Sequence, residues 1–202
     1  MLKLTKTDLK AQQYRLSQLE KYLPILILKR MLLQAEVNQA DQELQQLQLE
    51  FNTTNKQVMA YCPLFSQRDA TLFLSPLNIV AVQTQVHNLA GVEVPVFQTI
   101  LFQEEHYSLF DSPVWLDPAV KGMQKLITFH EKIKIVKRKK NALEKELRSV
   151  SIRINLFEKV LIPRINRDIT KIKIFLGDQQ LSEICQAKLA KKKKIKREEM
   201  VS

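Results

Sequence analysis

Glycine is the residue type that this sequence lacks most. Only 3 of its 202 residues are Gly, whereas globular proteins contain about 7 % glycine on average. Few glycines leave few positions for tight turns, while Leu, Lys, Gln, Glu and Ile are abundant. This composition favours long helices joined by few turns. Hydrophobic residues make up 45 % of the chain, which is enough to build a core and speaks against disorder throughout.

Cysteine and histidine are scarce as well. The two cysteines, Cys62 and Cys185, stand outside any CxxC or Cys/His spacing, and two thiols do not make a disulfide framework. The three histidines are scattered, and none has a Cys, Glu or second His at ligand spacing. Glycine-rich phosphate loops are also missing. We therefore expect no catalytic residue, no metal site and no cofactor, so that the chain is not an enzyme on its own.

Long apolar runs are missing too. The longest apolar cluster, Leu23 to Leu28, contains Pro24 and is much shorter than the roughly 18 residues that a membrane-spanning helix needs. The first residues contain no apolar core of a signal peptide. The sequence predicts a protein of the reducing cytoplasm that does not cross a membrane.

The N-terminal third carries a 3-4 alternation of apolar residues from Leu9 to Val58. Such spacing keeps one stripe facing a partner helix in a left-handed coiled coil, although the stripe could also pack into a compact bundle. Thr7, followed by Asp8, is the expected N-cap. Pro24 predicts a kink or a fresh helix start, and Arg30 either sets the register or extends outward to solvent. The seam consists of Leu9, Gln12, Leu16, Leu19, Leu23, Leu26, Arg30, Leu33, Val37, Ala40, Leu44, Leu47, Phe51, Thr54 and Val58.

A second seam of the same kind occupies the C-terminal part. Its steps from Phe157 to Ile169 run 4-4-4, a stutter that relaxes left-handed supercoiling. Pro163 either kinks or ends the helix there, and the stripe that resumes beyond it favours a kink. Two apolar seams of similar length can bury each other when the chain folds back on itself. The predicted fold class is therefore mainly α, a long antiparallel two-helix coiled coil. The second seam consists of Leu126, Phe129, Ile133, Val136, Lys140, Leu143, Leu147, Val150, Ile154, Phe157, Leu161, Ile165, Ile169, Ile172 and Leu176.

The segment between the two helices breaks the helical period and holds most of the prolines. Ile79 to Val86 and Val92 to Leu101, on either side of the turn-like stretch 88–91, predict a short β-hairpin. Pro95 should then lie at an edge or a bulge. The aromatic residues of this middle module form either its own core or a patch that another protein covers. They are Phe97, Phe102, Tyr107, Phe110 and Trp115.

Positive charge is concentrated in the C-terminal part. The net charge is +11, and residues 119–202 hold 23 basic and 9 acidic side chains, against 9 and 12 in residues 1–118. The basic clusters at 137–140 and 191–197 raise a nucleic-acid hypothesis, but no nucleic-acid-binding motif accompanies them. Lysines also suit the C-terminal end of a helix dipole. The predicted segments are an N-terminal coiled-coil helix (1–60), a middle module (61–117), a C-terminal coiled-coil helix (118–190) and a basic tail (191–202).

Four stretches follow one another along nearly the whole chain: LTKTDL at 4–9, NLAGVEVP at 88–95, LDPAV at 116–120 and NLFEKVLIPRI at 155–165. In this order they resemble the D subunit of V-type and A-type rotary ATPases. The last stretch is the most specific. The lysine-rich tail through Lys196 also looks like the C-terminus of that family.

The resemblance implies a non-catalytic central-stalk rotor subunit, which transmits torque between the A/B catalytic ring and the membrane ion-translocating sector. It implies the A and B subunits, the F subunit and a membrane-side stalk subunit (C/d type) as partners, and a cytoplasmic location peripheral to the membrane. Ring contacts are expected at both helix ends and F-subunit contacts in the middle module. The expected contact residues are Leu9, Leu16, Pro163, Arg164, Lys171, Lys191, Lys192, Gly91, Pro95 and Trp115.

A second hypothesis belongs to a different class of protein. The chain could be a free-standing coiled-coil adaptor whose basic tail binds nucleic acid or an acidic membrane. A rotor binds its ring with a defined stoichiometry and no nucleic acid, whereas an adaptor of this kind binds polyanions with a steep salt dependence.

Overall fold

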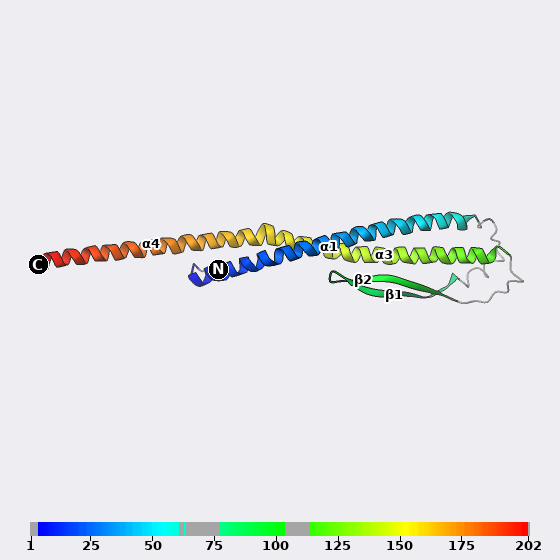
Figure 1. Cartoon of the computed structure of the whole chain (residues 1–202), viewed down its shortest axis with the longest axis horizontal. Helices are drawn as coiled ribbons and strands as arrows, with labels where there is room; N and C mark the ends of the chain where they lie inside the picture. The colour runs from blue at the N-terminus through cyan, green and yellow to red at the C-terminus, as the bar shows by residue number, and fades with distance from the viewer. Residues whose placement is uncertain (1–3, 61–62, 64–76, 104–113, 202) are drawn as a thin grey trace. The chain divides into compact units, whose positions relative to one another are not determined.

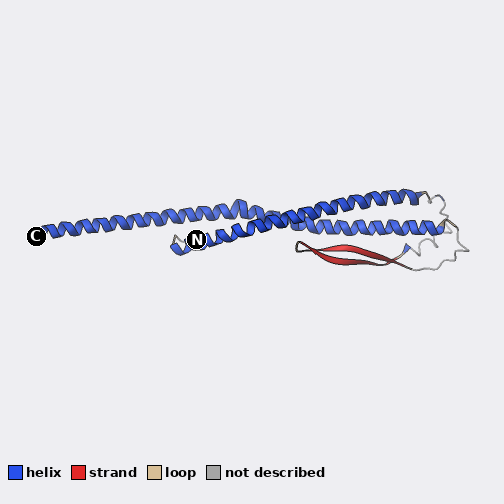
Figure 2. Cartoon of the chain, viewed as in Figure 1, coloured by secondary structure: helices blue, strands red, loops and turns tan. Residues whose placement is uncertain are grey.

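The protein is described here by a computed structural model that covers residues 4–60, 63, 77–103 and 114–201. Its elements are α1 (Lys6–Met59), β1 (Ile79–Leu89), β2 (Val92–Phe102), α3 (Leu116–Leu156), the π-helical turn η3 (Phe157–Leu161) and α4 (Ile162–Val201) (Figure 1). Helices dominate, and a β-hairpin, which comes between α1 and α3 in chain order, lies beside α3 (Figure 2). The predicted fold class is confirmed. Cys62, Tyr107 and Phe110 lie outside the described residues.

Contacts divide the chain into two compact units. The hairpin unit is Lys29–Ser149, and the terminal unit is Met1–Leu28 together with Val150–Ser202. Helix α1 therefore contributes to both units, as does α3, because each unit boundary falls inside a continuous helix.

Helix α1 begins with a side-chain cap at Thr5. Thr5 Oγ1 accepts a hydrogen bond from the backbone amide of Asp8 at 3.2 Å, and the Leu9 amide donates to the Thr5 carbonyl oxygen at 3.0 Å. The first bond satisfies a backbone donor that the first helical turn would leave without a partner, and the second is the first hydrogen bond of the helix itself. The predicted cap at Thr7 is therefore wrong by two residues. The spacing from Thr5 to Asp8 is the better cap signal, because the side chain of an N-cap residue accepts a hydrogen bond from the amide two or three residues further on.

Pro24 does not interrupt α1. The helix is continuous on both sides of Pro24, whose side chain is exposed. Proline cannot donate a backbone hydrogen bond, so the helix loses one bond at this position. The neighbouring seam residues Leu23 and Leu26 nevertheless remain half-buried. The sequence also allowed a new helix to begin at Pro24, and the continuous helix excludes this alternative.

The N-terminal seam is the buried face of α1. Leu33, Val37, Ala40 and Val58 are at most 5 % exposed, and the other seam residues are half-buried with one exception. The exception is Arg30, whose side chain is exposed. Of the two roles that the sequence allowed for Arg30, extension outward to solvent is confirmed.

In the hairpin unit, α1 and α3 run antiparallel. Lys29 of α1 pairs with Glu146 of α3, whereas Val58, at the other end of α1, packs against Gly122 near the start of α3. A Cβ atom added to Gly122 would lie 2.8 Å from Val58 Cγ2, which is too close for a non-bonded contact. Glycine therefore permits a close approach of the two helices at this end.

Strands β1 and β2 form the predicted hairpin, in the same unit. Leu89 pairs with Val92, so the turn is the two residues Ala90 and Gly91, with φ angles of 51° and 82°. Positive φ at both positions is what a type I′ turn requires. Asn88 supports the turn, because its Oδ1 accepts a hydrogen bond from the Gly91 amide at 2.9 Å. The turn is tighter than the predicted stretch 88–91, and β1 continues to Leu89.

The hairpin packs against the helices through β2. Val94 of β2 is fully buried, while β1 is exposed over most of its length. Both strands of a two-stranded sheet are edge strands, so the predicted edge position of Pro95 is confirmed. At the start of α3, Trp115 and Leu77 pack on a small core of Leu116, Ala119 and Val120.

In the terminal unit, the first half of α1 packs on η3 and α4, again antiparallel. Leu9 lines a groove with Leu176, whereas Leu19, ten residues further along α1, lines a groove with Phe157 and Leu161. The residues of this unit that are at most 7 % exposed are Val150, Ile154, Ile169 and Ile172.

The stutter coincides with the π-helical turn η3. The Ile162 amide donates to the Phe157 carbonyl oxygen, five residues back. A π turn holds one residue more than an α turn, so it absorbs the extra residue of the 4-4-4 spacing and keeps Phe157, Leu161 and Ile165 half-buried. Pro163 follows directly, and the helix does not end there. Of the two outcomes that the sequence allowed at Pro163, the end of the helix is excluded, and the predicted kink is compatible with a π turn, which is one of the known causes of helix kinks.

Candidate partner-binding surfaces

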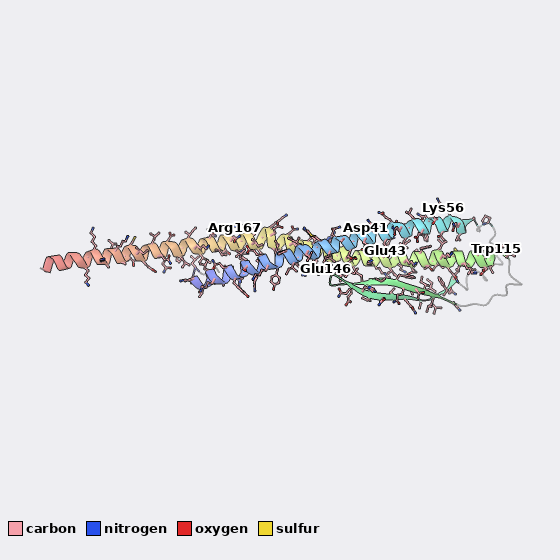
Figure 3. The ribbon with its side chains drawn as sticks, in the orientation of Figure 1. Asp41, Glu43, Lys56, Trp115, Glu146 and Arg167 are labelled. Carbon is pink, nitrogen blue, oxygen red and sulfur yellow. The ribbon has the colours of Figure 1, made fainter. Side chains whose placement is uncertain are left out.

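Three ion pairs join α1 to α3 in the hairpin unit. Along α1 one basic residue is followed by two acidic residues. Along α3 two basic residues are followed by one acidic residue. Opposite charges therefore face each other only when the two helices run antiparallel. Figure 3 labels the three acidic residues of these pairs, Asp41, Glu43 and Glu146. The pairs are Lys29 Nζ with Glu146 Oε1 at 3.1 Å, Lys139 Nζ with Glu43 Oε2 at 3.3 Å, and Lys140 Nζ with Asp41 Oδ1 at 2.6 Å.

Lys140 occupies a position of the predicted seam. Its hydrogen bond to the Asp41 carboxylate raises the pKa of the Lys140 amine above its usual value, and partial burial opposes this shift. The basic cluster 137–140 is therefore divided between two environments. Lys139 and Lys140 face α1, whereas Lys137 and Arg138 are exposed.

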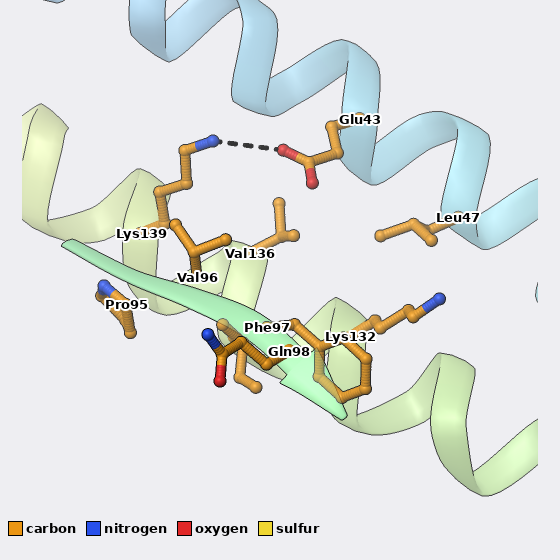
Figure 4. Close-up of a pocket in the computed structure, with 10 residues that line it drawn as sticks. Glu43, Leu47, Pro95, Val96, Phe97, Gln98, Lys132, Val136 and Lys139 are labelled. Carbon is orange, nitrogen blue, oxygen red and sulfur yellow. Dashed lines mark hydrogen bonds and ion pairs between the residues drawn. The ribbon is translucent and has the colours of Figure 1, made fainter. Parts of the chain in front are cut away.

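A hollow of about 390 Å³ lies between α1, β2 and α3 in the same unit (Figure 4). Leu47, Phe97 and Val136 supply apolar walls, and the Lys139–Glu43 pair lies at one side. Lys132 lies at another side, with its Nζ 5.2 Å from the centre of the Phe97 ring and 5.7 Å from that of Phe129. Both distances are in the range of cation–π attraction.

The terminal unit holds a wider groove of about 890 Å³ between α1 and the η3–α4 segment. Arg15 reaches it from α1 and Arg164 from α4, and both arginines are exposed. Its walls also include the Tyr22 ring, which is 57 % exposed, and half-buried Leu161. This groove therefore offers both apolar surface and planar cations.

The C-terminal half of α4 continues beyond the residues that face α1. Glu183 of α4 still lines a groove with α1, and every residue from 178 to 194 is exposed. Apolar side chains such as Leu181 and Leu189 share this stretch with Lys191 and Lys192. The stretch is therefore a helix surface that nothing in the described part of its own unit covers.

The predicted ring-contact residues fall into two structural groups. Leu9 and Leu16 are half-buried in the α1 seam, and Leu9 lines a groove together with residues of α4. Pro163 is half-buried beside the π turn. The side chains that face solvent on α4 are Arg164, Lys171, Lys191 and Lys192.

The predicted contact residues of the middle module lie at different places in the hairpin unit. Gly91 is exposed in the hairpin turn, Pro95 lines the hollow, and Trp115 is half-buried against the core at the start of α3. Sequence reasoning missed Lys132 and Arg15, and it missed the partners of the three ion-paired lysines. The only sequence signal for those partners is the antiparallel register, from which opposite charges can be matched across the seam.

Metal-binding and membrane-spanning features are absent from the described part of the chain. No group of three or more His, Cys, Asp and Glu side chains there could hold a metal ion. Within the same residues, no helix is long and apolar enough to cross a membrane.

These features define an antiparallel coiled-coil protein with a side hairpin, whose candidate sites are grooves and exposed helix faces. The profile of the family described as the ATP synthase D subunit matches residues 8–192. The D subunit of the V-type ATP synthase of Chlamydia abortus is 38 % identical over 199 residues, covering 98 % of this chain and 96 % of the relative. That of Chlamydia pneumoniae is 36 % identical over 193 residues, covering 95 % and 92 %. The chain belongs to the ATP synthase D-subunit family.

Proposed function

We propose that this chain is the non-catalytic central-stalk rotor subunit of a V/A-type rotary ATPase, and that it transmits torque between the A/B catalytic ring and the membrane ion-translocating sector. The observation that carries this proposal is the family match over residues 8–192, with relatives named as the D subunit of V-type ATP synthases. The proposal places the chain on the cytoplasmic side, peripheral to the membrane.

The helix pairing suits a part that is twisted. A single helix bends easily, whereas two helices with a shared buried seam resist bending and sliding. Ion pairs across α1 and α3, such as Lys29–Glu146, add a penalty for any change of register. Each side chain of that pair is 32 % exposed, so its contribution to stability is about 1 kcal/mol or less.

The surfaces support a division of partners along the chain. The A and B subunits would contact the two coiled-coil segments, 1–60 and 118–190, at the groove that holds Arg15 and Arg164 and along the exposed part of α4. The basic tail, 191–202, would turn against acidic loops of the ring without permanent contacts. The middle module, 61–117, would meet the F subunit, and a membrane-side stalk subunit of the C/d type would complete the rotor.

Reconstitution tests this proposal. The chain is mixed with the A and B subunits of its own organism, with and without the F subunit, and the assembly is purified and assayed for ATP hydrolysis. We expect one copy per three A/B pairs and an altered, cooperative turnover. The double variant Lys191→Glu with Lys192→Glu should weaken capture without abolishing it. A ring that forms normally and never retains this chain would refute the rotor function.

One observation favours a second candidate function. The lysines at 191 and 192 lie on a helix stretch that is exposed throughout, as expected for an adaptor that binds nucleic acid or an acidic membrane. The logarithm of the binding constant for such a complex falls linearly with the logarithm of the salt concentration. Titration with a DNA duplex and with anionic vesicles between low and physiological salt distinguishes it from the rotor, which should bind neither tightly at physiological salt.

A further inference from the structure

The hollow between α1, β2 and α3 has the size and lining of a small-molecule site. Its volume of about 390 Å³ falls within the range of roughly 300–1,000 Å³ that is usual for ligand pockets. Apolar side chains from all three elements line it, among them Leu47, Phe97 and Val136. Figure 4 shows these side chains around one space, with charged groups at its sides. A ligand that fits would therefore combine an apolar part with a polar or charged group.

The charged groups around the hollow are not balanced. Glu43 and Lys139 neutralise each other at 3.3 Å. Lys132 makes no ion pair with a carboxylate in the described part of the chain, and its neighbours are the rings of Phe97 and Phe129. Ring faces attract the amine but carry no net charge. The hollow therefore presents one cation whose charge no anion offsets.

We propose that this hollow binds a small amphiphilic carboxylate, such as a medium-chain fatty acid. The carboxylate lies at Lys132, where a charge-assisted hydrogen bond forms, and the hydrocarbon chain covers Leu47, Val136 and Phe97. A neutral amphiphile leaves the lysine unmatched, and a short carboxylate leaves the apolar walls in water. The site belongs to the hairpin unit alone, so it does not depend on the proposed rotor function.

Calorimetric titration of the full chain with decanoate, below its micelle concentration, tests the proposal. We expect one saturable site per chain, with weaker binding of decanol and of butyrate. Lys132→Gln should weaken decanoate binding about fivefold or more, because it removes the charge-assisted contact. The matched control is Lys137→Gln, which removes the same charge from an exposed position of α3 and should leave the affinity unchanged.

A second variant tests the apolar part of the site. Leu47→Trp fills the hollow and should abolish saturable decanoate binding, while circular dichroism shows that the helices persist. Three results would overturn the proposal: no saturable binding of decanoate by the wild-type chain, equal weakening by the Lys132 and Lys137 variants, or equal affinity for decanol and decanoate. The last two would mean diffuse charge attraction and purely apolar adsorption, respectively.

Discussion

The two units share one heptad pattern and use it differently. In the hairpin unit, Leu33, Ala40 and Leu143 are fully buried, ion pairs cross between the helices, and a hairpin covers part of the pair. In the terminal unit, Leu9, Leu19 and Leu161 are only half-buried, and two open grooves separate their side chains. On α1 the seam therefore reaches full burial only in the hairpin unit, whereas in the terminal unit the buried seam residues, such as Ile154 and Ile172, lie on α3 and α4.

The largest expected effect comes from truncating matched leucines in the two units. Leu143→Ala removes a fully buried side chain and should lower the free energy of unfolding by about 2–5 kcal/mol, because a cavity remains. Leu161→Ala removes a half-buried side chain from an open groove and should cost about 1 kcal/mol. Urea unfolding followed by circular dichroism measures both losses. Equal losses of unfolding free energy would show that the difference in burial between Leu143 and Leu161 does not affect stability.

Two glycines sharpen the same comparison. Gly122→Ala places a methyl group against Val58, and overpacking of this kind costs about 1–3 kcal/mol. Part of that loss is offset, because alanine is the better helix former by about 1 kcal/mol. Gly177→Ala in α4 meets nothing within 4 Å, so only the helix propensity changes and stability should rise by about 1 kcal/mol. Opposite shifts in melting temperature are expected, and a stabilising Gly122→Ala would contradict the close helix contact.

The hairpin turn should respond to substitution with opposite signs at its two positions. Ala90 has a φ of 51°, which a residue with a Cβ adopts at a cost, and Asn tolerates this conformation better. Ala90→Asn should therefore stabilise the hairpin unit by about 0.5–1 kcal/mol, whereas Gly91→Ala at φ 82° should destabilise it by about 1–2 kcal/mol. Amide hydrogen exchange of β1 and β2 reports both. A neutral Gly91→Ala would rule out the positive φ.

The smallest expected effect is a dependence of stability on alkaline pH. Because the Asp41 carboxylate raises the pKa of Lys140 in the folded chain, the Lys140–Asp41 pair stabilises the fold fully below the usual lysine pKa. That stabilisation disappears as the pH rises through the higher, folded value. Comparing the wild type with Asp41→Asn isolates the pair among many lysines. The melting-temperature gap between the two should be constant from pH 7 to about pH 10 and should narrow above it; a gap that widens would reverse the assigned direction of the shift.

Local pattern was enough to predict much of this fold. The apolar spacing from Leu9 to Val58 corresponds to the buried face of α1, and Arg30 extends outward, which is one of the two roles that the sequence allowed. The Ala90–Gly91 turn follows from turn chemistry that acts over a few residues. The cap at Thr5 was also within reach of the sequence, through the Thr-x-x-Asp spacing to Asp8, but the neighbouring Thr7–Asp8 pair offered a competing signal.

The candidate sites were less predictable. The hollow needs side chains from α1, β2 and α3 together, and only the packing of the hairpin on the helices brings Leu47, Phe97 and Lys132 to one place. The sequence predicted the lysines of α4 as contact residues because of their charge. Arg15 is a candidate only because the tertiary structure places it in one groove with Arg164 in the terminal unit.

The sequence by itself determined the helices, their apolar faces and the hairpin, because these depend on interactions between residues a few positions apart. The tertiary structure decided which side chains meet across the seam, such as Lys140 with Asp41. It also decided that a π turn rather than a broken helix accommodates Pro163. The physical reason is the register. The sequence of one helix does not determine which residues of a second helix it contacts. Ion pairs between the helices, the close approach at a glycine and the accommodation of an extra residue contribute to stability only once the two helices pack in a defined register.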